Sequence, residues 1–202
     1  MLSARPQIRG FSLLELMVVV AIASVLAAMA MPAYRTWIAN SKVRAVAESM
    51  GSNLRVAQAE SVNRFRRVVF YRADQSNCSS APNASASGNY WVIKTIPLVT
   101  GEVPVVVKCG TVSDVANNVT IADGPTAVCF GTNGRPVAVA DPGIGGAACT
   151  VPVTPYNYKL LVNGSPVADR PLQIRVELGG SVRMCDPAKT YSDSTPDGCP
   201  AT

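Results

Sequence analysis

The most regular feature of the chain is an apolar run over residues 11–31. Leu, Val, Ala, Met and Ile fill most of these positions, and Glu15 is the one charged residue among them. As a helix rising about 1.5 Å per residue, the run would be about 31 Å long, which matches the hydrocarbon thickness of a bilayer. We therefore predict a helix that crosses a membrane once, preceded by a short basic segment over residues 1–10.

The position of Glu15 separates three interpretations of this run. A cleaved secretory signal has an apolar core of about 7–15 residues, and this run is longer and contains a charge. A plain membrane anchor gains nothing from an acid that costs about 2.5–3.5 kcal/mol at the bilayer centre. The third interpretation, which we favour, is that the helix has a protein partner that supplies a cation to Glu15.

The helical pattern continues beyond the apolar run. Pro32 is expected to kink or loosen the helix because proline lacks a backbone donor. After it, apolar or small residues recur every three or four positions, which is typical of an amphipathic helix. These residues are Val43, Val46, Met50, Leu54, Ala57 and Ser61. We predict that residues 32–65 continue the helix and pack this stripe on a globular head.

The rest of the chain alternates short β-branched or aromatic segments with loops rich in Gly, Pro, Ser and Asn. The predicted strands are 68–71, 90–96, 103–108, 119–121, 127–130, 136–140, 156–162, 172–178 and 182–185. Asn163-Gly164 and Gly179-Gly180 are hairpin-turn signals. One N-terminal helix followed by strands predicts the α+β class, with the helix packed on an antiparallel β-sheet head over residues 66–202.

Composition and charge narrow the possible functions. The chain has 202 residues, of which 48% are hydrophobic and 15% charged, which excludes a disordered protein. It contains no histidine, and therefore lacks the usual general base and the commonest metal ligand. Nucleotide-binding, zinc-protease and serine-hydrolase motifs are missing as well, so we predict a protein that is not an enzyme and has no metal or cofactor. The net charge of +5 is concentrated in residues 32–72, which hold eight basic and two acidic residues.

All six cysteines lie after residue 77, and none has the Cys-x-x-Cys spacing of a zinc or redox site. They are Cys78, Cys109, Cys129, Cys149, Cys185 and Cys199. An even number in a loop-rich region indicates disulfides formed in an oxidising compartment. Cys185 and Cys199 enclose a short polar segment with no core of its own, so we predict that these two are paired. The other four allow three pairings, between which the sequence does not choose.

Residues 9–20, Arg-Gly-Phe-Ser-Leu-Leu-Glu-Leu-Met-Val-Val-Val, resemble the leader signal of type IV pilins and type II secretion pseudopilins. In that family a basic leader ends in Gly, the mature chain begins with Phe, and its fifth residue is Glu. Gly10, Phe11 and Glu15 match these places, and Pro32 stands where the family commonly has proline. The order of segments 57–64, 90–92, 119–121 and 130–136 resembles the GspH/FimT group, and residues 182–187 resemble FimT and FimU tails.

The resemblance implies that prepilin peptidase cleaves between Gly10 and Phe11 and that Phe11 is then N-methylated. Glu15 would pair with the N-terminal ammonium of an adjacent subunit and set the register between packed helices. The implied protein is a minor pilin, inserted once in the lipid of the inner membrane with a periplasmic head. It would prime or cap a type IV pilus for twitching motility or DNA uptake, with other major and minor pilins as partners. The alternative is a GspH-type minor pseudopilin of the type II secretion system.

A group of arginines raises a third possibility, a pilus-tip DNA receptor for natural transformation. Arg64, Arg66, Arg67 and Arg72 interleave with aromatic residues, a combination that suits the phosphates and bases of DNA. DNA-binding FimT proteins carry a C-terminal Gly-Arg-x-Arg motif, of which this chain retains the second arginine, Arg183. The alternative is that these arginines serve the end of the helix or contact neighbouring pilins.

Overall fold

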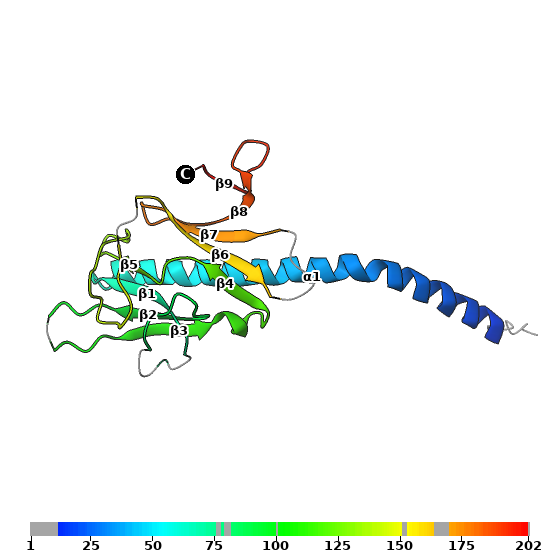
Figure 1. Ribbon diagram of the computed structural model, residues 1–202, viewed down its shortest axis with the longest axis horizontal. Coiled ribbons are helices and arrows are strands. Elements are labelled where there is room, and N and C mark those ends of the chain that lie inside the picture. Colours follow the sequence, from blue (N-terminus) through cyan, green and yellow to red (C-terminus); the bar gives the residue numbers. More distant parts are fainter. Residues whose placement is uncertain are drawn as a thin grey trace, which may run out of the picture.

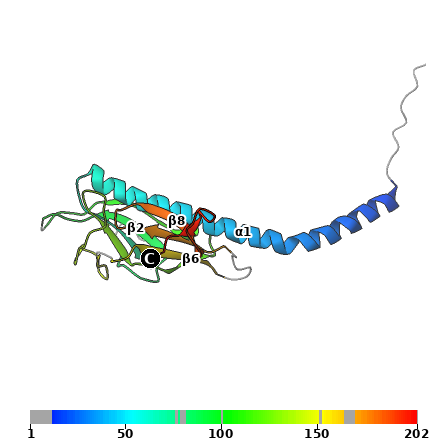
Figure 2. The same ribbon diagram turned by 90° about the horizontal axis from the view of Figure 1, so that it is seen from above.

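The computed structural model describes residues 12–75, 78, 82–99, 101–150, 153–163 and 170–201. A single long helix, α1 (Leu13–Asn63), runs along a β-rich head and projects far beyond it (Figures 1 and 2). The helix has 51 residues, so it is about 77 Å long. Its buried residues lie between Ala39 and Ser61, and the C-terminal half of α1 is therefore the part that belongs to the head.

Four strands form the first sheet, in the order β3-β2-β1-β5. They are β1 (Val68–Ala73), β2 (Tyr90–Thr95), β3 (Val106–Thr111) and β5 (Ala127–Phe130), and all neighbours are antiparallel. Strand β1 is buried along its whole length because both of its faces are covered. Phe70 packs into the core that contains α1, whereas Tyr71 packs with residues of the 137–149 segment on the opposite face.

Five strands form the second sheet, in the order β4-β6-β7-β8-β9. They are β4 (Val119–Asp123), β6 (Tyr156–Val162), β7 (Leu172–Val176), β8 (Val182–Thr190) and β9 (Gly198–Cys199). All neighbours are antiparallel except β8 and β9, which pair in parallel. A short 3₁₀ helix, η1 (Val112–Asp114), lies between β3 and β4.

The main core lies where α1 meets one face of each sheet. The predicted helix stripe is buried at every position from Val43 to Ser61, which confirms that this half of α1 packs on the head. The two sheets also contact each other, because Phe70 on β1 meets Tyr158 on β6 edge to face, with ring centroids 6.2 Å apart. Burial of these large apolar side chains stabilises the head by about 1.5–3 kcal/mol each.

The α+β class and the helix-on-sheet head are confirmed, but the strands differ from the expected ones in several places. The head contains two sheets where one was expected. The predicted strand 136–140 is wrong: this segment forms only isolated bridges, Phe130 to Pro136 and Val139 to Cys149, as it crosses the outer face of the first sheet. Strand β3 begins at Val106 rather than 103, after Pro104, which cannot donate to a ladder. The turn at Asn163-Gly164 lies partly outside the described residues.

Candidate functional site

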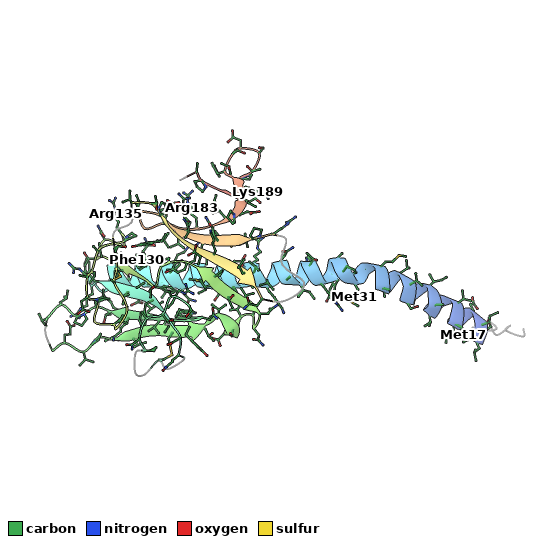
Figure 3. The ribbon with its side chains drawn as sticks, viewed as in Figure 1. Met17, Met31, Phe130, Arg135, Arg183 and Lys189 are labelled. Atoms are coloured by element: carbon green, nitrogen blue, oxygen red, sulfur yellow. A yellow bond between two sulfur atoms is a disulfide. The ribbon has the colours of Figure 1, made fainter. Side chains whose placement is uncertain are left out.

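The projecting half of α1 is the most unusual surface of the molecule. Every residue from Leu13 to Arg35 is exposed, and the most apolar 18-residue window of α1 has a mean hydropathy of 2.5 with none of it buried. A core helix of similar composition would be covered by its own protein, but this one extends into open space, as the labelled Met17 and Met31 show (Figure 3). By length and composition it can cross a membrane.

Glu15 lies in the first turn of this exposed helix. Ser12 is the N-cap residue, and its hydroxyl oxygen accepts a hydrogen bond from the Glu15 N–H at 3.2 Å. An acid in the first turn is favourable because the N-terminus of a helix carries partial positive charge. The Glu15 carboxylate is exposed and forms no ion pair with the described residues, so it can meet a cation from another molecule. Gly10 and Phe11, the expected cleavage and methylation residues, lie outside the described residues.

The helix remains continuous through Pro32. The hydroxyl of Thr36 donates to the Pro32 carbonyl oxygen at 3.3 Å, so this turn keeps a polar contact. Figure 2 shows that the projecting half of α1 changes direction relative to the half on the head. Proline removes one backbone hydrogen bond, which makes it a common position for such a bend.

Two aromatic side chains lie between the apolar half and the buried half of α1. Tyr34 and Trp37 stack with ring centroids 6.1 Å apart, and their exposed fractions are 56% and 64%. Exposed Tyr and Trp at the end of an apolar helix are typical of residues at a membrane–water interface. This pair was not predicted, although Tyr34 and Trp37 are three residues apart, a spacing that places both rings on one face of a helix.

The structure does not bring the candidate DNA-binding arginines together. Arg72 is fully buried, and its guanidinium donates to the carbonyl oxygens of Gly88 at 3.0 Å and Ile121 at 2.9 Å. Burial lowers the pKa of Arg72, an effect that nearby Tyr158 and Asp123 oppose. The inclusion of Arg72 in a DNA-binding group was therefore wrong, because its side chain joins the first sheet to the second instead of reaching solvent.

The remaining arginines lie on two separate parts of the head. Near the end of α1, Arg64 pairs with Glu60 and Arg66 pairs with Glu102, while Arg67 is exposed. Arg183 is also exposed, but it lies on β8 of the second sheet (Figure 3). Two of the arginines next to the helix are thus already neutralised by acids, which weakens the electrostatic attraction that DNA binding needs.

Three disulfides join Cys78 to Cys109, Cys129 to Cys149, and Cys185 to Cys199. The last is the pair that the sequence favoured, and the first two are one of the three pairings that it left open. The Cys129–Cys149 bond fastens the 137–149 segment to the outer face of the first sheet, where both sulfur-bearing residues are buried.

The Cys185–Cys199 bond closes a loop that stands out from the head (Figure 1). Inside this loop, the Lys189 ammonium pairs with Asp197 and lies 3.6 Å from Asp186. The hydrogen bond from the Lys189 ammonium to the Asp197 carboxylate raises the pKa of Lys189 and lowers that of Asp197. These carboxylates therefore face an ammonium, and among the described residues no group of acids, cysteines or histidines could hold a metal ion.

Comparisons with known proteins match the projecting helix first of all. Residues 5–31 match the prokaryotic N-terminal methylation motif. Over 54 residues the chain is 48% identical to the type IV major fimbrial protein FimA of Dichelobacter nodosus, which is 27% of this chain and 33% of that protein. The alignment thus spans about a third of the length of the curated relatives that the chain matches.

Two solved structures resemble parts of this chain. The type IV minor pilin FimU of Pseudomonas aeruginosa has a TM-score of 0.47 at 16% identity, with 79% of this chain and 96% of that chain covered. The minor pseudopilin EpsH of the type 2 secretion system of Vibrio cholerae has a TM-score of 0.44 at 11% identity, with 73% and 99% covered. In this chain the prokaryotic N-terminal methylation motif is joined to an α+β head.

Proposed function

We propose that this protein is a minor pilin that primes or caps a type IV pilus by packing its N-terminal helix among those of other subunits. The observation that carries the proposal is the exposed apolar half of α1 with a single acid, Glu15, in its first turn. A surface of this kind needs lipid around it before assembly and other apolar helices around it afterwards. The methylation motif over residues 5–31 supports the same function.

In the proposed mechanism, prepilin peptidase removes residues 1–10 and leaves Phe11 as the methylated N-terminus. The new ammonium and the Glu15 carboxylate then lie four residues apart, near one end of the helix. Apolar helices have no hydrophobic driving force to associate in lipid, since lipid tails are as apolar as leucine, and van der Waals packing alone fixes their axial register weakly. A charge pair between the ammonium of one subunit and Glu15 of its neighbour supplies the missing register, and it offsets the cost of about 2.5–3.5 kcal/mol for an acid at the bilayer centre.

The proposed location is the inner membrane, with the head in the periplasm, followed by transfer into the fibre. Three disulfides in the head suit an oxidising compartment such as the periplasm. The stacked pair Tyr34 and Trp37 would lie at the periplasmic face of the inner membrane and hold the helix at a fixed depth.

The experiment that tests the proposal replaces Glu15 with valine in the full chain and follows incorporation into sheared pili by immunoblot. Glu15→Val should insert into the membrane at least as well as the parent, because an apolar residue replaces a charge. It should be processed but missing from the sheared fraction. The matched control is Val20→Leu, which changes an exposed residue of the same helix without altering its charge. If Glu15→Val enters the fibre at the parental level, the assigned role of the acid is wrong.

A further inference from the structure

An exposed apolar surface lies at the end of the head opposite the projecting helix. It consists of Phe65, Leu98, Val99 and Val103, and we call these residues the distal patch. Their side chains are 78%, 59%, 67% and 81% exposed. The C-terminal end of α1 and the hairpin between β2 and β3, which carry the patch, lie far from the N-terminal part of α1 in both views (Figures 1 and 2).

The two segments that carry the distal patch are joined firmly to each other. The Ile96 N–H donates to the Arg67 carbonyl oxygen at 2.9 Å, next to the helix end. Arg66 forms an ion pair with Glu102 on the hairpin. The same Glu102 carboxylate accepts a hydrogen bond from the Leu98 N–H at 2.9 Å, which closes the tip of the hairpin. The patch is therefore one prearranged surface, and prearrangement reduces the entropy that binding must overcome.

Phe65 occupies a backbone position that normally belongs to glycine. Its N–H bonds to the Val62 carbonyl oxygen at 3.2 Å, and the Arg66 N–H bonds to the Ser61 carbonyl oxygen at 3.1 Å, which is the Schellman pattern of a helix end. The φ angle of Phe65 is +51°, the one positive value among the described residues other than glycine. A side chain disfavours this left-handed conformation. Since the Phe65 ring is mostly exposed, packing within its own chain does not compensate for that cost.

We propose that the distal patch is the docking surface for the head of a different subunit, one that presents an apolar surface with a carboxylate at its edge. The proposal rests on the proposed function for the kind of partner, a subunit that assembles into the same fibre. The membrane cannot be the occupant, because the patch lies at the opposite end from the membrane helix. An apolar surface this exposed and this firmly held is typical of a protein-binding site.

Charge decides between a second copy and a different subunit. The arginines around the patch exceed the acids: Arg64 and Arg66 are paired with Glu60 and Glu102, whereas Arg67 is exposed and has no ion pair with the described residues. A symmetric contact between two copies would place two unpaired Arg67 guanidinium groups in one interface without adding a free carboxylate, which is unfavourable. A carboxylate on the partner, facing Arg67, makes the contact favourable and sets its orientation.

The test places a photo-crosslinking amino acid at position 103 of the full chain, in cells that assemble pili, with the same amino acid at exposed Leu161 on β6 as the control. Light should join position 103, and not position 161, to the head of another pilin subunit, at a peptide containing Asp or Glu. Arg67→Glu should reduce the yield about fivefold or more. An adduct with a second copy of this chain, with lipid or with nucleic acid, or no adduct at all, would overturn the proposal.

A second variant, Phe65→Gly, separates binding from folding. Glycine adopts a positive φ without strain, so the urea midpoint of the variant should equal or exceed that of the parent. The crosslink from position 103 should nevertheless fall, because the largest side chain of the patch is gone. A lower urea midpoint would show that Phe65 serves the fold and would overturn its assignment to docking. A missing crosslink in a chain that still enters the fibre contradicts the distal patch alone, whereas fibre entry of Glu15→Val contradicts the proposed function.

Discussion

Replacing Arg72 with alanine tests whether this arginine holds the two sheets together. Its side chain is 0% exposed and donates two hydrogen bonds, one to the Gly88 carbonyl and one to the Ile121 carbonyl on β4. The bond to β4 crosses from the first sheet to the second. Alanine at this position removes both bonds, leaves two buried carbonyl groups without this donor, and opens a cavity in the core.

The size of the effect follows from these contacts. A hydrogen bond to a charged group contributes about 1.5–3 kcal/mol, so the two bonds of Arg72 contribute at least about 3 kcal/mol. The cavity adds to the loss, and relief from burying a charge subtracts from it. We expect Arg72→Ala to lower the free energy of unfolding by about 3 kcal/mol, equivalent to a urea midpoint about 1.5 M lower at a slope of about 2 kcal/mol/M.

The assay is urea unfolding of the full chain in detergent. Unfolding is monitored by the fluorescence of Trp91, which is buried in the core. A Trp37→Phe background removes the signal of the exposed tryptophan. Arg67→Ala is the control, because this arginine is exposed, immediately precedes β1, and its loss should cost less than about 0.5 kcal/mol. Equal stability of Arg72→Ala and Arg67→Ala would refute the structural role of Arg72.

Three further predictions concern the head. Serine at both Cys185 and Cys199, 14 positions apart, should lower the free energy of unfolding by about 3 kcal/mol in urea titrations, and an unchanged midpoint would contradict the loop-closure argument. Burial raises the pKa of Tyr71 to about 12, above the value of about 10 in an unfolded chain. The free energy of unfolding should therefore fall as the pH rises from 10 towards 12, and it should fall less steeply in Tyr71→Phe. Gly180→Ala should destabilise by about 2 kcal/mol in thermal melts, since φ is +94° and its Cβ would lie 2.3 Å from a carbonyl oxygen, whereas Gly179→Ala, with open space around it, should not.

The helix and most strands were predictable because their signals are local. The stripe from Val43 to Ser61 repeats with the helical period, and strands β5 and β6 have the predicted bounds because β-branched and aromatic residues fill them. The segment 136–140 misled the prediction because its composition suits a strand, while its position depends on a disulfide and on the outer face of the first sheet. Local composition does not contain that information.

The candidate site was predictable only in part, because some of its residues depend on contacts with distant parts of the chain. Glu15 stands out in the sequence as a charge in an apolar run, and its assignment to a charge pair with another subunit stays a prediction. Arg72 was misplaced because its partners, the carbonyls of Gly88 and Ile121, are 16 and 49 positions away, so no spacing rule could reveal its burial. The positive φ of Phe65 also escaped notice, since a glycine is the usual sign of such a helix end.

The proposal that α1 is processed for assembly with other subunits is tested most directly by the intact mass of the protein. The protein is extracted from the membranes of cells with an active prepilin peptidase. A helix made for assembly should have lost residues 1–10 and should begin at Phe11 carrying one added methyl group. A chain that still begins at Met1 in these cells would contradict the account, because Glu15 would then have no neighbouring N-terminal ammonium to pair with.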